Sequence, residues 1–123
     1  MAIKIYQYSK CDTCRKAIKF LDSQGIDYEQ IPIVESPPSQ AELKQMLGYI
    51  KGQGGSLKNL FNTSGVQYRE MGIASLLKEG LDEDEAIKLL SKSGKLIKRP
   101  FLLAQKDGRV GFNASDWTEL LVE

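Results

Sequence analysis

The sequence predicts an α/β domain with a four-stranded mixed sheet, in the order βαβ, helical insertion, ββα. Two observations lead to this prediction. Residues 2–8 and 26–34 have strand patterns, and between them Cys14, Ala17, Ile18 and Leu21 recur with the spacing of an amphipathic helix. Asp107-Gly108 is a strong hairpin signal between short strands at 101–104 and 109–112. Because a helix joins the first two strands, we expect them to be parallel.

A helical insertion is predicted at about residues 36–95. Pro37-Pro38 ends the βαβ unit, and Ser39 with Glu42 matches a capping box at the start of a helix. We expect one domain over residues 1–123, because no linker, repeat or low-complexity segment divides the chain. Further elements are expected as a helix through Ile50, a short helix at 57–61, a turn at 62–65, a helical stretch at 71–77, a helix from Asp82 to Ser91 and a last helix at 114–122.

Composition and charge exclude several classes of function. The chain has 123 residues, 41% hydrophobic and 27% charged, with a net charge of +1. This charge gives no reason to expect direct binding to nucleic acid or a membrane surface. The chain lacks an apolar run of spanning length and the apolar block of a signal peptide. With two cysteines, we expect a cytoplasmic protein that is a monomer.

The sequence contains no histidine. This absence excludes Ser-His-Asp and Cys-His nucleophile pairs, histidine-ligated metals and acid–base work by histidine. Activation of a cysteine would therefore have to come from cations, backbone N–H groups or a second thiol.

Cys11 and Cys14 form a Cys-x-x-Cys motif where the first strand gives way to the first helix. This position in a βαβ unit is typical of a thioredoxin-like redox motif. We expect the helix to begin near Thr13 and its free N–H groups, with nearby basic residues, to favour the thiolate of Cys11 over the opposing charge of Asp12. Cys11 would then be the nucleophile and Cys14 the resolving thiol. Two inert cysteines, or half of a metal site, remain alternatives.

Lys98-Arg99-Pro100 is the second candidate constellation. The planar guanidinium of Arg99 matches tetrahedral oxyanions, and the strand that follows Pro100 could bring it near the cysteines. A solvated basic pair before a strand is the alternative interpretation.

The chain resembles the ArsC/Spx family of thioredoxin-fold proteins along nearly its whole length. This resemblance implies a thioredoxin core with a helical insertion, and a cis Pro100 that faces Cys11. The matching stretches are Tyr8-Ser9-Lys10-Cys11-Asp12-Thr13-Cys14-Arg15-Lys16-Ala17, Glu35-Ser36-Pro37-Pro38-Ser39 with Glu42-Leu43, Asn62-Thr63-Ser64-Gly65 with Tyr68-Arg69-Glu70, Leu96-Ile97-Lys98-Arg99-Pro100, and Val110-Gly111-Phe112-Asn113.

Two branches of this family imply different functions. In the glutaredoxin-linked arsenate reductases one cysteine attacks arsenate and three arginines hold the oxyanion. Cys11 and Arg99 match the nucleophile and one arginine, whereas Asn62 and Asn113 stand at the other two arginine positions. Asparagine supplies a hydrogen bond but no charge, and those enzymes have no counterpart of Cys14.

The Spx branch keeps a Cys-x-x-Cys switch and binds the C-terminal domain of the RNA polymerase α subunit. The strongest overall likeness is to small uncharacterised reductase-like members that carry Cys-x-x-Cys.

The leading hypothesis from the sequence is therefore a cytosolic thiol–disulfide oxidoreductase of the arsenate reductase-like type. It would hold no cofactor, and glutathione, glutaredoxin or thioredoxin would supply its electrons. The alternative is an Spx-type redox-sensing regulator that binds the RNA polymerase α subunit. The residues expected to bind the substrate or its anionic group are Arg99, Asn62, Asn113, Asp12, Thr13 and Arg15.

Overall fold

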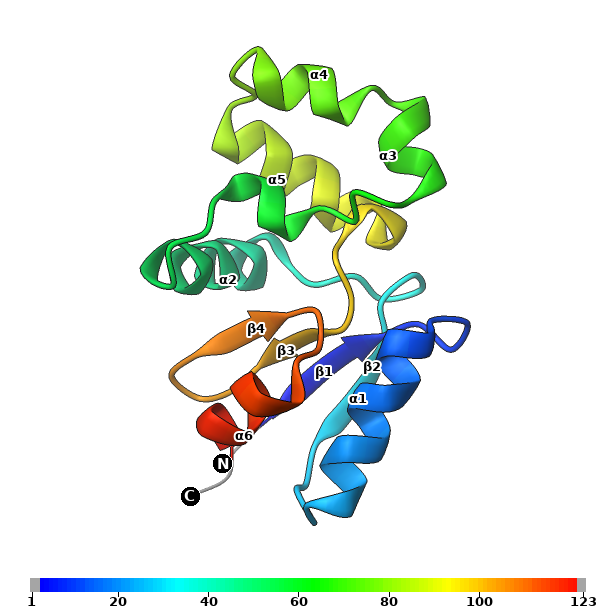
Figure 1. Ribbon diagram of the computed structural model, residues 1–123. Helices are drawn as coiled ribbons and strands as arrows, with labels where there is room; N and C mark the ends of the chain where they lie inside the picture. Colours follow the sequence, from blue (N-terminus) through cyan, green and yellow to red (C-terminus); the bar gives the residue numbers. More distant parts are fainter. Residues whose placement is uncertain (1–2, 122–123) are drawn as a thin grey trace.

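The computed structural model describes residues 3–121 and contains the expected four-stranded mixed sheet (Figure 1). The strand order is β2-β1-β3-β4, with β1–β2 parallel and the other two pairs antiparallel. The strands are β1 (Lys4–Gln7), β2 (Glu29–Pro32), β3 (Phe101–Leu103) and β4 (Gly108–Val110). Helix α1 (Asp12–Ser23) connects β1 to β2, so the predicted βαβ unit is confirmed.

The helical insertion lies between β2 and β3. In Figure 1, α2 lies next to the sheet, and α3, α4 and α5 lie beyond it. A final helix follows β4. The remaining elements are α2 (Gln40–Gly52), η1 (Leu57–Leu60), α3 (Val66–Glu70), α4 (Ile73–Lys78), α5 (Glu83–Lys92), η2 (Gly94–Leu96) and α6 (Ala114–Leu121).

Two apolar clusters lie on the two faces of the sheet. Side chains alternate across a strand, so Phe101 and Leu103 pack with the residues of α2 and the insertion. Leu102, between them, packs with α1 and with the fully buried Trp117 of α6. Both faces of β3 are therefore covered, which explains why its sequence is an unbroken apolar run.

Helix starts follow the predicted capping signals. The hydroxyl of Ser39 accepts a hydrogen bond from the Glu42 N–H (3.1 Å), and the Glu42 carboxylate accepts one from the Ser39 N–H (3.2 Å). The Asp82 carboxylate likewise accepts from the Glu85 N–H. Helix α1 begins at Asp12 with Cys11 as its N-cap, one residue earlier than expected.

The structure corrects several expected boundaries. The strands are shorter than expected: residues 3 and 8 are outside β1, residues 26–28 and 33–34 are outside β2, Ala104 is outside β3, and residues 111–112 are outside β4. Helix α3 was not predicted, because among its five residues only Tyr68 is buried and so no period is visible. The helical stretch expected at 71–77 begins only at Ile73, as α4. Gly72, with φ of +63°, precedes it and separates it from α3. Residue 2 and Val122, expected in the first strand and last helix, lie outside the described residues.

Among the described residues, no helix has both the length and the apolar character needed to cross a membrane.

Candidate active site

Cys11 lies at the junction of β1 and α1 with its sulfur directed at the start of the helix. Its backbone is extended (φ −102°, ψ 116°), and its Sγ accepts a hydrogen bond from the Cys14 N–H at 3.3 Å. The Cys11 N–H donates to the carbonyl of Tyr8 at 3.0 Å, which fixes the loop on the other side. Cys11 is partly exposed, and both cysteines are free thiols. A free N–H at a helix N-terminus stabilises a thiolate, so this geometry suits a nucleophile.

Cys14 lies in the first turn of α1 and is fully buried. Burial raises the pKa of its thiol to about 12, and the hydrogen bond and negative charge of Cys11 act in the same direction. The backbone N–H of Tyr8 and the charge of Arg99 oppose this shift in pKa. Cys14 is therefore protonated at neutral pH, whereas Cys11 alone meets the solvent.

A cleft of about 480 Å³ opens beside Cys11. It brings together segments that are far apart in the sequence: the start of α1, the turn before α3, the segment before β3, and the residues between β4 and α6. The residues that line the cleft are Cys11, Thr13, Asn62, Ser64, Lys98, Arg99, Val110, Gly111, Phe112, Asn113 and Asp116. Five predicted site residues, namely Cys11, Thr13, Asn62, Arg99 and Asn113, thus share one cleft.

Arg99 is held in place by an aromatic ring. Its guanidinium carbon lies 4.8 Å from the ring centroid of Tyr8, a cation–π contact. Arg99 lines both the cleft and an adjoining hollow of about 640 Å³. The Arg99–Pro100 peptide bond is cis, and Pro100 is buried and is not among the residues that line the cleft.

The side chains of Asn113 and Asn62 each form one hydrogen bond within the protein. The side-chain oxygen of Asn113 accepts from the Asp116 N–H at 3.0 Å, the geometry of an N-cap on α6, so its amide hydrogens remain for a ligand. The side-chain nitrogen of Asn62 donates to the Lys95 carbonyl at 3.5 Å, a long and weak contact. Neither supplies charge, as the sequence indicated.

Asp12 and Arg15 do not lie at this cleft. They stand three residues apart on one face of α1, form an ion pair with each other, and line a separate hollow with Gln7 and Ser9. Arg15 also donates to the Ser9 carbonyl at 3.1 Å. They thus line a different hollow from Thr13, and their expected role in anion binding stays a prediction.

Two charged residues outside the predicted set of binding residues, Lys98 and Asp116, also line the cleft. Arg109 donates to the Asp116 carboxylate at 2.9 Å and also pairs with Asp107 at 2.9 Å, so its single positive charge offsets the charge of Asp116 only in part. The sequence signal for Lys98 was its place beside Arg99 in Lys98-Arg99-Pro100, and the structure adds that its side chain lies next to Gly111, which has φ of +75°.

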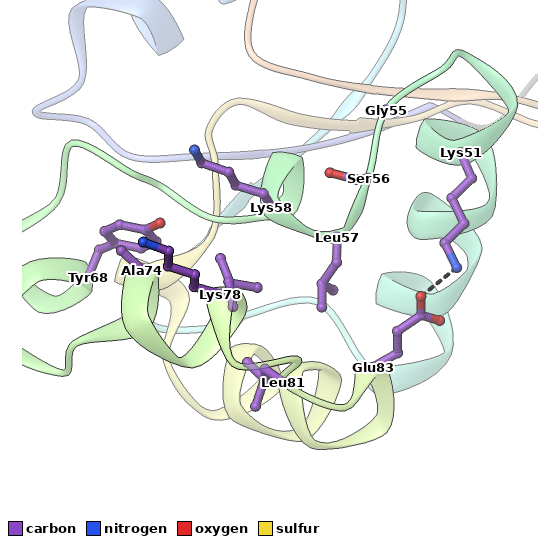
Figure 2. Close-up of a pocket in the computed structure, with 11 residues that line it drawn as sticks. Lys51, Gly55, Ser56, Leu57, Lys58, Tyr68, Ala74, Lys78, Leu81 and Glu83 are labelled. Atoms are coloured by element: carbon purple, nitrogen blue, oxygen red, sulfur yellow. Dashed lines mark hydrogen bonds and ion pairs between the residues drawn. The ribbon is translucent and has the colours of Figure 1, made fainter.

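A larger cavity of about 820 Å³ lies in the helical insertion and contains no cysteine (Figure 2). Leu57, Leu81 and Tyr68 give it apolar walls, and an ion pair between Lys51 and Glu83 closes one side at 2.5 Å. Within residues 3–121, no three His, Cys, Asp or Glu side chains group together in a way that could hold a metal ion.

Known proteins resemble this chain over nearly its full length. YusI of Bacillus subtilis, an uncharacterised protein, is 43% identical over 119 residues, which cover 97% of this chain and 98% of YusI. The global transcriptional regulator Spx of Streptococcus pyogenes is 25% identical over 114 residues, which cover 93% of this chain and 81% of Spx.

Solved structures agree with these relatives. An ArsC family related protein from Bacteroides fragilis is 39% identical with a TM-score of 0.86, covering 98% of each chain. A protein described as a possible arsenate reductase from Streptococcus mutans is 38% identical with a TM-score of 0.79, covering 90% of this chain and 91% of its own.

These neighbours confirm a thioredoxin-like fold of the arsenate reductase-like type. The sequence model of the ArsC family matches residues 6–120. The chain belongs to the ArsC family.

Proposed function

We propose that this protein is a thiol–disulfide oxidoreductase in which Cys11 is the nucleophile and Cys14 the resolving thiol. The observation that supports this most directly is the pairing of the two residues: the N–H of buried Cys14 donates to the sulfur of partly exposed Cys11. One thiol thus meets the substrate, and the other stands behind it, held protonated by burial.

The reaction would proceed in two exchanges. The Cys11 thiolate attacks one sulfur of a substrate disulfide, forms a mixed disulfide and releases the other half as a thiolate that takes a proton from water. Cys14 then loses its proton and attacks the Cys11 sulfur, which releases the second half and forms the Cys11–Cys14 disulfide. A dithiol such as reduced thioredoxin or glutaredoxin, or two molecules of glutathione, returns two electrons and two protons.

Cys14 must lose its proton for the second exchange, and its environment changes at that moment. In the mixed disulfide, Cys11 carries neither negative charge nor a thiol, so two of the contributions that raise the pKa of Cys14 disappear. The charge of Arg99, which lowers that pKa, remains. Attack on Cys11 therefore prepares Cys14 for its own step.

The test compares Cys11→Ser and Cys14→Ser in a coupled reduction assay with a small disulfide substrate. Cys11→Ser should abolish turnover. Cys14→Ser should accumulate a mixed disulfide on Cys11, visible as added mass by intact mass spectrometry. Turnover that is unchanged in Cys11→Ser would contradict the proposal.

The similarity to Spx supports a second candidate, a redox-sensing regulator that binds the C-terminal domain of the RNA polymerase α subunit. Here the same cysteine pair would signal by forming its disulfide once, without turnover. Binding of that domain by the oxidised but not the reduced protein, with no reductase activity, would favour this candidate.

A further inference from the structure

The side chain of Lys98 lies across Gly111 at the edge of the Cys11 cleft. A Cβ atom at Gly111 would stand 3.0 Å from the Lys98 Cε and 4.0 Å from its Nζ. Gly111 has φ of +75°, a conformation that residues with a side chain rarely adopt. The glycine therefore provides both the turn after β4 and the space in which the lysine chain lies.

The backbone on both sides of this contact is fixed by hydrogen bonds. The Lys98 N–H donates to the Leu60 carbonyl at 2.8 Å, and the Gly111 N–H donates to the Pro100 carbonyl at 2.9 Å. One residue beyond, Arg99 is fixed against Tyr8. The two cations of the cleft thus start from anchored positions on the same short segment.

The charges that line the cleft do not cancel. Lys98 and Arg99 are positive, and neither forms an ion pair within the described part of the chain. Asp116 is the one acidic residue of the lining, and its carboxylate is bound to Arg109. The lining therefore carries two positive charges against one negative charge, so the space beside Cys11 is electropositive on balance.

We propose that Lys98 is a substrate-binding residue of the cleft and that, together with Arg99, it selects substrates carrying an anionic group close to the atom that Cys11 attacks. Lys98 thus supplies a charge that Asn62 and Asn113 lack. The anionic group is a carboxylate or a tetrahedral oxyanion, since both match two cations and the free amide hydrogens of Asn113. This inference rests on the proposed role of Cys11 as the nucleophile.

The test measures the alkylation rate of Cys11 by iodoacetate, which is anionic, relative to iodoacetamide, which is neutral. In both reactions the sulfur displaces iodide and forms one C–S bond, so the ratio of rates cancels the thiolate fraction and reports the local charge. Lys98→Met should lower this ratio roughly three- to tenfold at low salt, and the loss should shrink in high salt. Lys98→Arg should keep the ratio close to that of the wild type.

Lys58→Met is the matched control. Lys58 is also exposed, but it lines the separate cavity of the insertion (Figure 2), so its loss should leave the ratio unchanged. Protection of Cys11 from iodoacetamide by inorganic phosphate or by acetate then distinguishes an oxyanion from a carboxylate ligand. In either case Lys98→Met should weaken the protection.

A ratio that is unchanged in Lys98→Met, while Cys11 is still alkylated, would overturn the inference and leave the nucleophile intact. Equal losses in Lys98→Met and Lys58→Met would also overturn it, because they would indicate a general effect of net charge. A Cys11 that reacts with neither reagent would contradict the proposed function itself.

Discussion

The backbone N–H of Cys14 donates to the sulfur of Cys11 at 3.3 Å, while the Cys14 thiol is fully buried beneath it. One residue therefore contributes to the site in two ways. Its amide stabilises a thiolate on its neighbour, and its own sulfur is kept neutral and shielded. The asymmetry of the cysteine pair follows from this single turn of helix.

Alkaline unfolding should reveal the buried thiol. The pKa of Cys14 is raised from 9.0 to about 12 in the folded protein. Its stabilising contribution is complete below pH 9, where the thiol is protonated in both states. Between pH 9 and 12 the unfolded chain loses this proton and the folded protein keeps it, so the free energy of unfolding should fall by about 1.4 kcal/mol per pH unit.

The measurement is urea unfolding at pH 8.5 and at pH 10.5, with Cys14→Ser as the control because serine does not ionise there. The wild type should lose more stability than Cys14→Ser over this interval. Equal losses would show that the Cys14 thiol ionises equally readily in the folded and unfolded states.

The arrangement of the sheet could be predicted because its signals are local. The Asp107-Gly108 turn, the apolar run from Phe101 and the amphipathic pattern of α1 each report on a few neighbouring residues. The contents of the cleft could be predicted only in part. Arg15 and Lys98 are both basic residues close to a predicted site residue in the sequence. In the structure, Arg15 pairs with Asp12 away from the cleft, whereas the Lys98 side chain lies beside Gly111 at the cleft. Whether a basic residue reaches the cleft depends on how segments that are distant in the sequence pack together.

Acid unfolding should report on the contact between Tyr6 and Glu42. The Tyr6 hydroxyl donates to the Glu42 carboxylate at 2.6 Å, linking β1 to the start of α2. Burial tends to raise the pKa of Glu42, but the hydrogen bonds from Tyr6, Ser39 and Lys4 outweigh it and hold this pKa below its usual value. The stabilisation is therefore present above the unfolded pKa of about 4.5 and is lost as pH falls through the folded value.

Tyr6→Phe should lower the free energy of unfolding at pH 7 by about 1.5 kcal/mol, because the hydrogen bond involves a charged acceptor. This difference between wild type and variant should shrink steadily below pH 4.5. Tyr28→Phe is the matched control, since Tyr28 bonds to Asp22 at 2.7 Å on the surface of α1 and should cost less. A Tyr6→Phe effect that is constant with pH would contradict the assigned contact.

Two substitutions of Asn113 should separate its contribution to stability, as the cap of α6, from the effect of charge in the cleft. Asn113→Ala removes the N-cap of α6 and should cost about 1 kcal/mol of stability. Asn113→Asp keeps the cap, because a carboxylate accepts the same bond from the Asp116 N–H and is favoured by the helix dipole. It also adds a negative charge beside Lys98 and Arg99.

Asn113→Asp should therefore unfold at a similar denaturant concentration to the wild type but react several-fold more slowly with iodoacetate relative to iodoacetamide. An unchanged ratio of rates would show that the side chain of residue 113 does not meet the reagent. A large loss of stability would indicate that the cap geometry differs from that described.

Gly94 should be among the positions least tolerant of substitution. A Cβ there would stand 1.9 Å from the carbonyl oxygen of Ile33, a backbone atom that cannot turn aside as a flexible side chain could. This contact joins η2, just before the Lys98-Arg99 segment, to the chain that follows β2. Gly94→Ala should therefore lower the free energy of unfolding by more than about 3 kcal/mol and lower the reactivity of Cys11 toward iodoacetate.

Gly48→Ala is the matched control. Gly48 lies exposed in α2 with nothing within 4 Å of the new methyl group, so alanine should raise the free energy of unfolding by about 0.5 to 1 kcal/mol. Thermal unfolding of the two variants side by side checks both signs, and a Gly94→Ala protein as stable as the wild type would contradict the close approach of η2 to Ile33.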